Sequence, residues 1–296
     1  MTYICTRSTI STGNKNTKYK KFVQEVQYVQ GEWKMKTYVV ANQKGGIGKS
    51  TTATCLASEL QHKGYKVLLV DADQQGNSTD TYRAKIQGEA TLYDALLDES
   101  RIPLEEAVQH TECGDIVASD PLLREADKRL TTDVEGLYRM ADAIEELAKK
   151  RLYDFCIIDT APALNALTHS MLVAADKVIV PLDASRYSLQ GLAQLNESIM
   201  AIQRRQNPRL EIAGLLLVRY NPRTLLSKEV REALQTIATE MDTRVFETTI
   251  RESNKVREAQ AMRVPLREHA RNSTAQLDYE AFTEELLKGE RINGTK

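Results

Sequence analysis

A glycine- and lysine-rich loop is the part of this sequence best suited to chemistry. It reads Lys-Gly-Gly-Ile-Gly-Lys-Ser from Lys44 to Ser50, after an apolar run and before a helix-length segment. Glycines let successive backbone N–H groups converge on phosphate oxygens, and the positive end of the following helix adds to the attraction. Lys49 can reach the β- and γ-phosphates of a nucleotide, and the Ser50 hydroxyl can ligate Mg²⁺. The loop therefore matches a P-loop in its required context, with Gln43 in place of the first glycine.

Two aspartate clusters follow apolar runs elsewhere in the chain. Residues 67–70 run into Asp71 and Asp73, and residues 155–158 run into Asp159. Alone, an aspartate after a strand is more often a cap or turn residue. Ligands of open α/β sheets bind at the carboxyl ends of strands, where both clusters and the P-loop fall. The three segments together favour a functional interpretation.

Short apolar runs alternate with amphipathic stretches from residue 37 onward. Strands rich in Val, Ile and Leu that alternate with helices indicate βαβ units and a mostly parallel sheet with helices on both faces, an α/β fold. The expected strands are 37–42, 66–71, 115–118, 154–159, 177–181, 211–218 and 244–249, and the expected helices are 49–63, 134–150, 165–175, 187–206, 225–241 and 275–288.

Three motifs together resemble those of the ParA/Soj/MinD ATPases. Residues 44–50 are similar to the deviant Walker A motif of that family, 71–77 to its Walker A′ motif and 157–162 to its Walker B motif. Gln43 agrees with the deviant motif, and residues 220–224 and 257–259 are similar to later family signatures. The match extends from residue 36 to about residue 288. It implies the three-layer P-loop NTPase fold, with a single ATPase domain over residues 35–296.

The resemblance also implies a mechanism in which two subunits enclose two ATP molecules. Lys44 would reach the partner's phosphates in the manner of an arginine finger, and Lys49 would hold phosphates within its own subunit. Asp73 would orient or deprotonate the attacking water. ATP would therefore drive homodimer formation, and hydrolysis would end it. The implied nucleotide contacts are Gly45, Gly46, Ile47, Gly48, Lys49, Ser50, Thr51, Asn221 and Pro222, and the implied Mg²⁺ ligands are Ser50, Asp71 and Asp159.

Charge is unevenly distributed along a chain whose net charge is −1. Residues 1–36 and residues 201–275 each carry a net charge of +5, and the remainder carries −11. This balance excludes a globally basic nucleic-acid binder but leaves room for a local basic face. The resemblance implies non-specific double-stranded DNA binding by Arg223, Arg251 and Lys255, release stimulated by a ParB-like partner, and a nucleoid-associated protein of the cytoplasm. For any one basic residue, a solvated helix face is at least as good an explanation.

Two other function classes use similar chemistry. A MinD-like membrane switch would need a C-terminal amphipathic helix with a basic face, but residues 277–288 carry four acids before the first lysine. A metal-cluster carrier would need paired cysteines, and Cys5, Cys55, Cys113 and Cys156 form no CxxC pair. Free thiols in a reducing cytoplasm are the simpler interpretation. No apolar run reaches the roughly 18 residues of a membrane-spanning helix.

Residues 1–34 have a different composition from the rest of the chain. They are polar and basic, and too short for a core of their own or for a helix-turn-helix domain. We expect a flexible leader, with Met35 as a possible natural start, over the alternative of a basic arm that touches DNA.

Overall fold

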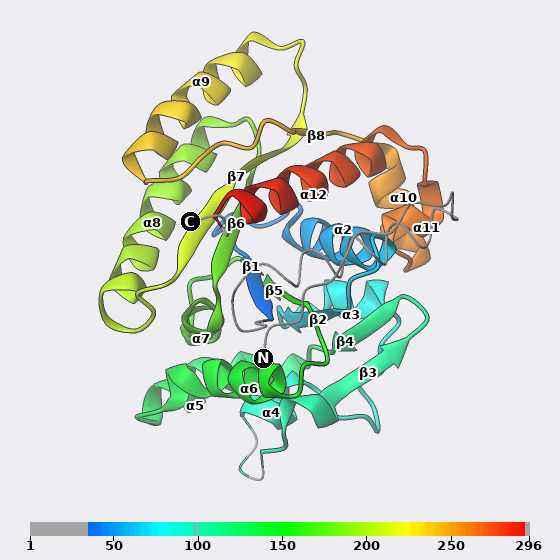
Figure 1. The fold of residues 1–296 in the computed structure, drawn as a ribbon, viewed down its shortest axis with the longest axis vertical. Coiled ribbons are helices and arrows are strands. Elements are labelled where there is room, and N and C mark those ends of the chain that lie inside the picture. Colours follow the sequence, from blue (N-terminus) through cyan, green and yellow to red (C-terminus); the bar gives the residue numbers. More distant parts are fainter. Residues whose placement is uncertain (1–34, 98, 100, 294–296) are drawn as a thin grey trace, which may run out of the picture. The chain divides into compact units, whose positions relative to one another are not determined.

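An eight-stranded sheet forms the centre of the computed structural model, which describes residues 35–97, 99 and 101–293 (Figure 1). The strand order is β3-β4-β2-β5-β1-β6-β7-β8, and all neighbours are parallel except β3 and β4. The strands are β1 (Lys36–Val40), β2 (Val67–Ala72), β3 (Val108–Thr111), β4 (Gly114–Val117), β5 (Phe155–Thr160), β6 (Lys177–Leu182), β7 (Glu211–Tyr220) and β8 (Ile250–Arg251).

The central strands β2, β5 and β1 bring together the segments that the sequence marked for chemistry. Nearly every residue in them is buried, because helices cover the sheet on both faces. Val40 pairs in register with Asp159, and Asp159 with Asp71. The P-loop and both aspartate clusters therefore leave the sheet side by side at its carboxyl edge.

The helices fall into two layers, as right-handed crossovers require. Helix α2 connects β1 to β2 in one direction along the sheet, whereas α6, α7, α8 and α9 connect strands in the opposite direction. Helix α2 therefore lies on one face and the other four lie on the opposite face, and α12 packs on α2 (Figure 1). The helices are α2 (Lys49–His62), α3 (Asn77–Thr81), α4 (Leu92–Leu96), α5 (Ala126–Thr132), α6 (Arg139–Lys149), α7 (Ala166–Ala174), α8 (Arg186–Arg205), α9 (Leu225–Glu240), α10 (Asn254–Met262), α11 (Leu266–Ala270) and α12 (Thr274–Asn293).

The α/β architecture and six of the predicted strands are confirmed, but the strand predicted at 244–249 is wrong. Val245 forms only an isolated bridge to Leu215. The next backbone N–H groups, of Glu247 and Thr248, donate instead to the carboxylate of Glu285 on α12, at 2.8 and 2.9 Å. An acidic side chain of a distant helix therefore replaces the strand partner. The sequence analysis also missed β3, β8, α3, α4, α5, α10 and α11.

Residues Lys34–Lys296 form one compact unit. The leader predicted for residues 1–34 lies outside the described residues. No helix within residues 35–97, 99 and 101–293 is long and apolar enough to cross a membrane.

Candidate active site

The loop between β1 and α2 has the backbone that phosphate binding requires. Gly46 and Gly48 adopt φ angles of 69° and 90°, which side-chain-bearing residues rarely adopt. Gly48 is also the N-cap residue of α2, and no side chain of a described residue accepts a capping hydrogen bond from the first N–H groups of the helix. These donors are consequently available to an anion, with the helix dipole behind them.

Lys49 lies at the floor of this loop and is almost entirely buried. Its ammonium donates to the Lys44 carbonyl at 3.1 Å, so the side chain folds back over the loop. Burial lowers the pKa of Lys49, and the nearby carboxylates of Asp159 and Asp73 partly oppose that shift. A bound phosphate would supply the negative charge that this ammonium needs.

Three carboxylates gather at the ends of β2 and β5. Asp71 is fixed by donors from its own loop: the Thr79 N–H at 2.7 Å, the Thr79 hydroxyl at 2.8 Å and the Asp73 N–H at 3.2 Å. Asp159 accepts from the Ser78 hydroxyl at 2.8 Å, and the Ser50 hydroxyl is close enough to lower its pKa. The Walker A′ and Walker B residues thus lie together beside the first turn of α2.

Burial raises the pKa of both Asp159 and Asp71, and the closeness of the two carboxylates raises that of Asp159 further. The Asp159 Oδ1 atom is buried and has no hydrogen-bond partner among the described residues. A hard divalent cation prefers oxygen ligands of this kind: a carboxylate oxygen without a hydrogen-bond partner and a serine hydroxyl beside it. The cation would also supply the positive charge that the buried carboxylates lack. The residues predicted to hold Mg²⁺ therefore fit it: Ser50, with Asp159 and Asp71 behind it.

Asp73 lies closer to the open space than Asp71 does. One of its carboxylate oxygens accepts the Gln75 N–H at 3.0 Å, and its carbonyl accepts the Ser119 hydroxyl at 2.6 Å. These bonds fix the loop around Asp73, and the residue lines the cavity. Asp73 can therefore accept a hydrogen bond from a water molecule there.

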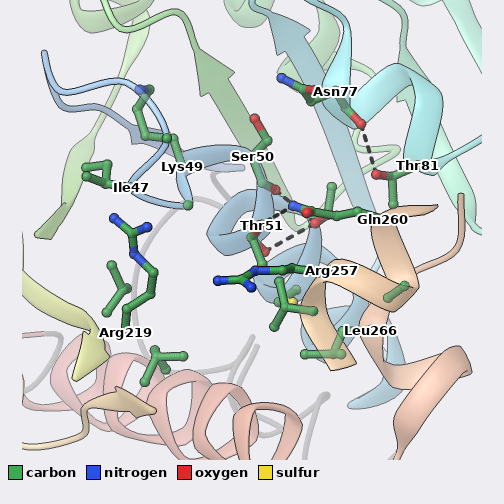
Figure 2. A pocket seen from close by; sticks show the side chains of 18 of the residues that line it. Ile47, Lys49, Ser50, Thr51, Asn77, Thr81, Arg219, Arg257, Gln260 and Leu266 are labelled. Carbon is green, nitrogen blue, oxygen red and sulfur yellow. Dashed lines mark hydrogen bonds between the residues drawn. The ribbon is translucent and has the colours of Figure 1, made fainter. Parts of the chain in front are cut away.

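A cavity of about 500 Å³ lies in front of these groups, the size of a small-ligand site. Its walls come from the P-loop and α2, from α3, from the ends of β7 and β8, and from α10 (Figure 2). Thr51 on α2 accepts a hydrogen bond from Gln260 on α10 at 3.0 Å, which joins two of these walls. Of the residues predicted to contact or act on the nucleotide, Gly45–Thr51 and Asp73 line the cavity, whereas Asn221 and Pro222 are exposed and lie outside the lining.

The far wall contains residues that the sequence analysis did not assign to the nucleotide. Val218, Arg219 and Ile250 line it, followed by Glu252 and Ser253. The available signal was the same as for the aspartates: these residues also end or follow strands at the carboxyl edge. What was missing was the knowledge that β8 begins at Ile250 and that α10 follows it.

Lys44 points away from the phosphate loop of its own subunit. Its ammonium lies 2.6 and 2.9 Å from the two carboxylate oxygens of Asp183, just after β6, and 3.1 Å from the Ser185 hydroxyl. The side chain is about one-third exposed. In this conformation Lys44 contributes nothing to a phosphate in its own cavity.

The three predicted DNA contacts lie at or beyond the carboxyl ends of β7 and β8. Arg223 is exposed and forms no ion pair with another described residue. Arg251 lines the cavity and pairs with Asp278 of α12 at 2.6 Å, and Lys255 pairs with Glu258 at 2.6 Å. Of these three residues, the structure therefore places only Arg251 in the cavity lining.

Comparison with known proteins agrees with this geometry. A family model described as an AAA domain matches residues 35–212. The chain is 34% identical to the chromosome partitioning protein ParA of Caulobacter vibrioides over 265 residues, which cover 88% of this chain and 97% of that protein. It is also 34% identical to the chromosome-partitioning ATPase Soj of Thermus thermophilus over 254 residues, 86% of this chain and 96% of Soj. The chain belongs to the ParA/Soj family of partition ATPases.

Solved structures of similar fold extend the agreement to the ligands of this ParA-like chain. Apo McdA from Cyanothece superposes with a TM-score of 0.76 at 25% identity, covering 86% of this chain and 99% of that one. Cobyrinic acid a,c-diamide synthase from Mycobacterium smegmatis, with bound ATP analogue and magnesium, gives 0.74 at 27%, covering 88% and 97%. The family, the cavity beside the P-loop and the carboxylate cluster together identify this protein as an ATP hydrolase that uses ATP and Mg²⁺.

Proposed function

We propose that this partition ATPase couples ATP binding to homodimer formation and to sequence-independent binding of double-stranded DNA. The observation that carries the proposal is the position of α10. This helix forms one wall of the nucleotide cavity and is bonded to α2 through Gln260 and Thr51. It carries two exposed cations, Arg257 in the cavity lining and Lys255 outside that lining. A change at the nucleotide therefore reaches a basic surface through one hydrogen-bonded contact.

The chemical step is assigned to residues already placed around the cavity. Lys49 and the N–H groups of residues 45–50 would hold the phosphates, and Asp73 would hold the attacking water and accept its proton. When bound, Mg²⁺ supplies charge neutralisation at the phosphate oxygens. Since Lys44 is directed away from its own cavity, we assign it to the phosphates of a second subunit. Hydrolysis would then need both subunits, which makes the dimer lifetime depend on the nucleotide.

DNA affinity is assigned to the basic residues beyond β7 and β8. Arg223 is exposed and unpaired among the described residues, so it is free to contact a phosphate. Arg251 and Lys255 are held by Asp278 and Glu258, and their pairs must loosen before they can serve DNA. Contacts of this kind read no sequence and weaken with salt. They would keep the ATP form on the nucleoid, from which a ParB-like partner would release it by stimulating hydrolysis.

The membrane switch is less well supported, because the last helix uses its apolar residues inside the protein. Tyr279, Phe282 and Leu286 of α12 are buried, and Phe282 packs edge-on against Phe246 at 4.9 Å. An apolar face already packed in this way is not available to lipid.

The test measures binding to a random-sequence DNA duplex with ATP, ADP or a slowly hydrolysed ATP analogue, across a salt series. We expect binding with ATP and the analogue only, weakening steeply as salt rises. Arg209→Ala is the matched control, because Arg209 is exposed but precedes β7 at the opposite edge of the sheet. Equal binding with ATP and ADP, or none at low salt, would overturn the DNA proposal and leave the ATPase assignment standing.

A further inference from the structure

Arg219 adopts a backbone conformation that is unusual for its position. Its φ angle is +50°, in the left-handed region, although it lies within β7. The other described non-glycine residues with positive φ all lie in turns: Arg83, Arg151, Asp242 and Arg263. A strained residue inside a strand persists only where its surroundings require it, and such positions concentrate at functional sites.

The strain at Arg219 coincides with an irregularity in the sheet. The pairing of β7 with β8 shifts register between Val218 and Tyr220, as at a β-bulge. A bulge turns a side chain away from the direction that the alternation of the strand would give it. Figure 2 shows the result: the Arg219 side chain extends from the end of β7 toward Ile47 of the P-loop.

The Arg219 guanidinium shares a carboxylate with Lys44. Its NH2 atom lies 3.1 Å from Oδ2 of Asp183, and the Lys44 ammonium lies 2.6 Å from the same oxygen. The Asp183 side chain is only 16% exposed, whereas those of Lys44 and Arg219 are 34% and 46% exposed. One nearly buried carboxylate thus binds two cations that both have room to move.

The other partners of Asp183 keep it charged and in place. The Ser185 hydroxyl donates to it at 2.8 Å, and the Ser188 hydroxyl donates to the same oxygen. Burial alone would raise the pKa of Asp183, but the hydrogen bonds from Lys44, Ser188 and Ser185 outweigh it and hold the pKa below its usual range. If Lys44 left with nothing to replace it, a buried negative charge would lose its main counter-ion.

We propose that Arg219 is a positioning residue for Lys44: it competes for Asp183 and stays on that carboxylate when Lys44 departs. In the nucleotide-free subunit the two cations divide Asp183 between them, so Lys44 is held but not locked. Arg219 then neutralises Asp183 after Lys44 has moved. The destination of Lys44, the phosphates of a second subunit, rests on the proposed function; the competition for Asp183 does not.

The competition is tested first in the nucleotide-free protein, by the rate at which acetic anhydride labels Lys44, read by mass spectrometry. Asp183→Asn should speed labelling, since it removes the main partner of Lys44. Arg219→Met should slow it, since Lys44 then has the carboxylate to itself, and Arg219→Lys should restore the wild-type rate. We expect changes of about two- to five-fold, the range that partly exposed charge pairs support.

Two other lysines provide controls within each variant. Lys66 is exposed, so its labelling rate measures the activity of the reagent in each experiment. The Lys177 side chain is only 12% exposed, so faster labelling of Lys177 would show that the variant is partly unfolded. Faster Lys44 labelling in Arg219→Met, with Lys177 unchanged, would show that Arg219 steadies Asp183 for Lys44, and would overturn the competition. An unchanged rate in Asp183→Asn would overturn the pair itself.

The consequence for assembly is tested by sedimentation of the same variants with a slowly hydrolysed ATP analogue. Asp183→Asn should strengthen the dimer and Arg219→Met should weaken it. The double variant should match Asp183→Asn, because Arg219 acts only through Asp183. A double variant weaker than Asp183→Asn would place the action of Arg219 elsewhere, such as on the nucleotide, and overturn the proposal.

The two measurements separate the possible failures. If the wild-type protein forms no dimer with nucleotide, the proposed function fails, and the labelling results still decide whether Arg219 and Lys44 compete. If the dimer forms but labelling shows no competition, only the role of Arg219 is lost.

Discussion

The carboxylates at the ends of β2 and β5 and the cations beyond β7 and β8 lie at the same edge of the sheet, but their surroundings are opposite. Asp71 and Asp159 are fully buried, and donors on α3 hold both in place: Thr79 for Asp71 and Ser78 for Asp159. Arg223, Arg251 and Lys255 are exposed, and two of them are paired with acids of other turns or helices. The first group is fixed before any ligand arrives, whereas the second must exchange its partners for a ligand.

This difference separates the residues expected to take part in ATP hydrolysis from the residues expected to link the nucleotide to DNA binding. A buried carboxylate cluster stores unfavourable electrostatic energy that a cation relieves, so its role follows from its position. An exposed cation in a surface pair contributes little by itself, and its role depends on which partner it leaves. Substitutions in the first region should therefore have large effects on hydrolysis or stability, and substitutions in the second should have small, additive effects on DNA affinity.

The largest effect is expected from Lys44→Ala. If Lys44 neutralises charge as an arginine finger does, the variant should lose about 10³–10⁵-fold in ATP hydrolysis and still bind ATP. Steady-state phosphate release and fluorescent-nucleotide binding measure the two quantities. Lys66→Ala, an exposed lysine at the opposite edge of the sheet, is the control. Wild-type turnover in Lys44→Ala would remove Lys44 from the reaction.

Asp73→Ala should reduce hydrolysis by about 10²–10⁴-fold, the range of general-base catalysis. Because ATP would still be bound but not cleaved, the ATP-bound dimer should persist in sedimentation long after the wild-type dimer has dissociated. Asp80→Ala is the matched control, since Asp80 lines the same cavity but pairs with Arg263 at its exposed rim. A variant of Asp73 that hydrolyses ATP normally would contradict the assignment.

Asp159→Asn should make the nucleotide-free protein more stable at neutral pH, by about 1–3 kcal/mol, because folding no longer has to bury a carboxylate or to protonate it. The folded-state pKa of Asp159 is raised, so above the ordinary carboxylate range the folded state binds more protons than the unfolded state. The free energy of unfolding of the wild-type protein should therefore fall as pH rises from about 4 toward the raised pKa.

Denaturant unfolding over a pH series measures this slope, which should flatten in Asp159→Asn. The same variant should lose the Mg²⁺ dependence of nucleotide binding. A free energy of unfolding of the wild-type protein that rises with pH between about 4 and the raised pKa would show that burying these carboxylates costs less than their burial indicates.

The smallest effects are expected beyond β7 and β8. Arg223→Ala should weaken DNA binding uniformly across sequences and reduce the salt slope by about 1, as for one lost phosphate contact. Arg251→Ala should weaken it less, since Asp278 already engages Arg251. Arg209→Ala serves as the control in the same titrations. An Arg251→Ala effect larger than that of Arg223→Ala would reverse the order and place Arg251 on DNA.

Most of the site could be predicted because its residues lie in short continuous motifs next to buried strands. Lys49, Ser50 and Asp73 fall where strand–loop–helix geometry must place them, and the central strands were recognisable from their apolar runs. The prediction failed where contacts between distant segments decide the outcome. Residues 244–249 have a strand-like composition, but Glu285 accepts the N–H groups of Glu247 and Thr248. The nucleotide contacts of Asn221 and Pro222 stay a prediction, since both residues lie outside the cavity lining.

The sequence by itself determined the class of fold, the phosphate loop and the position of the carboxylates predicted to hold Mg²⁺, because each depends on neighbours in the chain and on burial that apolar runs already indicate. Only the tertiary structure decided that Lys44 rests on Asp183, that Arg219 shares this carboxylate, and that α10 closes the nucleotide cavity. The physical reason is the range of the interactions. Helix dipoles and loop N–H groups act within one motif, whereas these ion pairs and cavity walls join residues that are 36 to 209 positions apart and meet only when the sheet is complete.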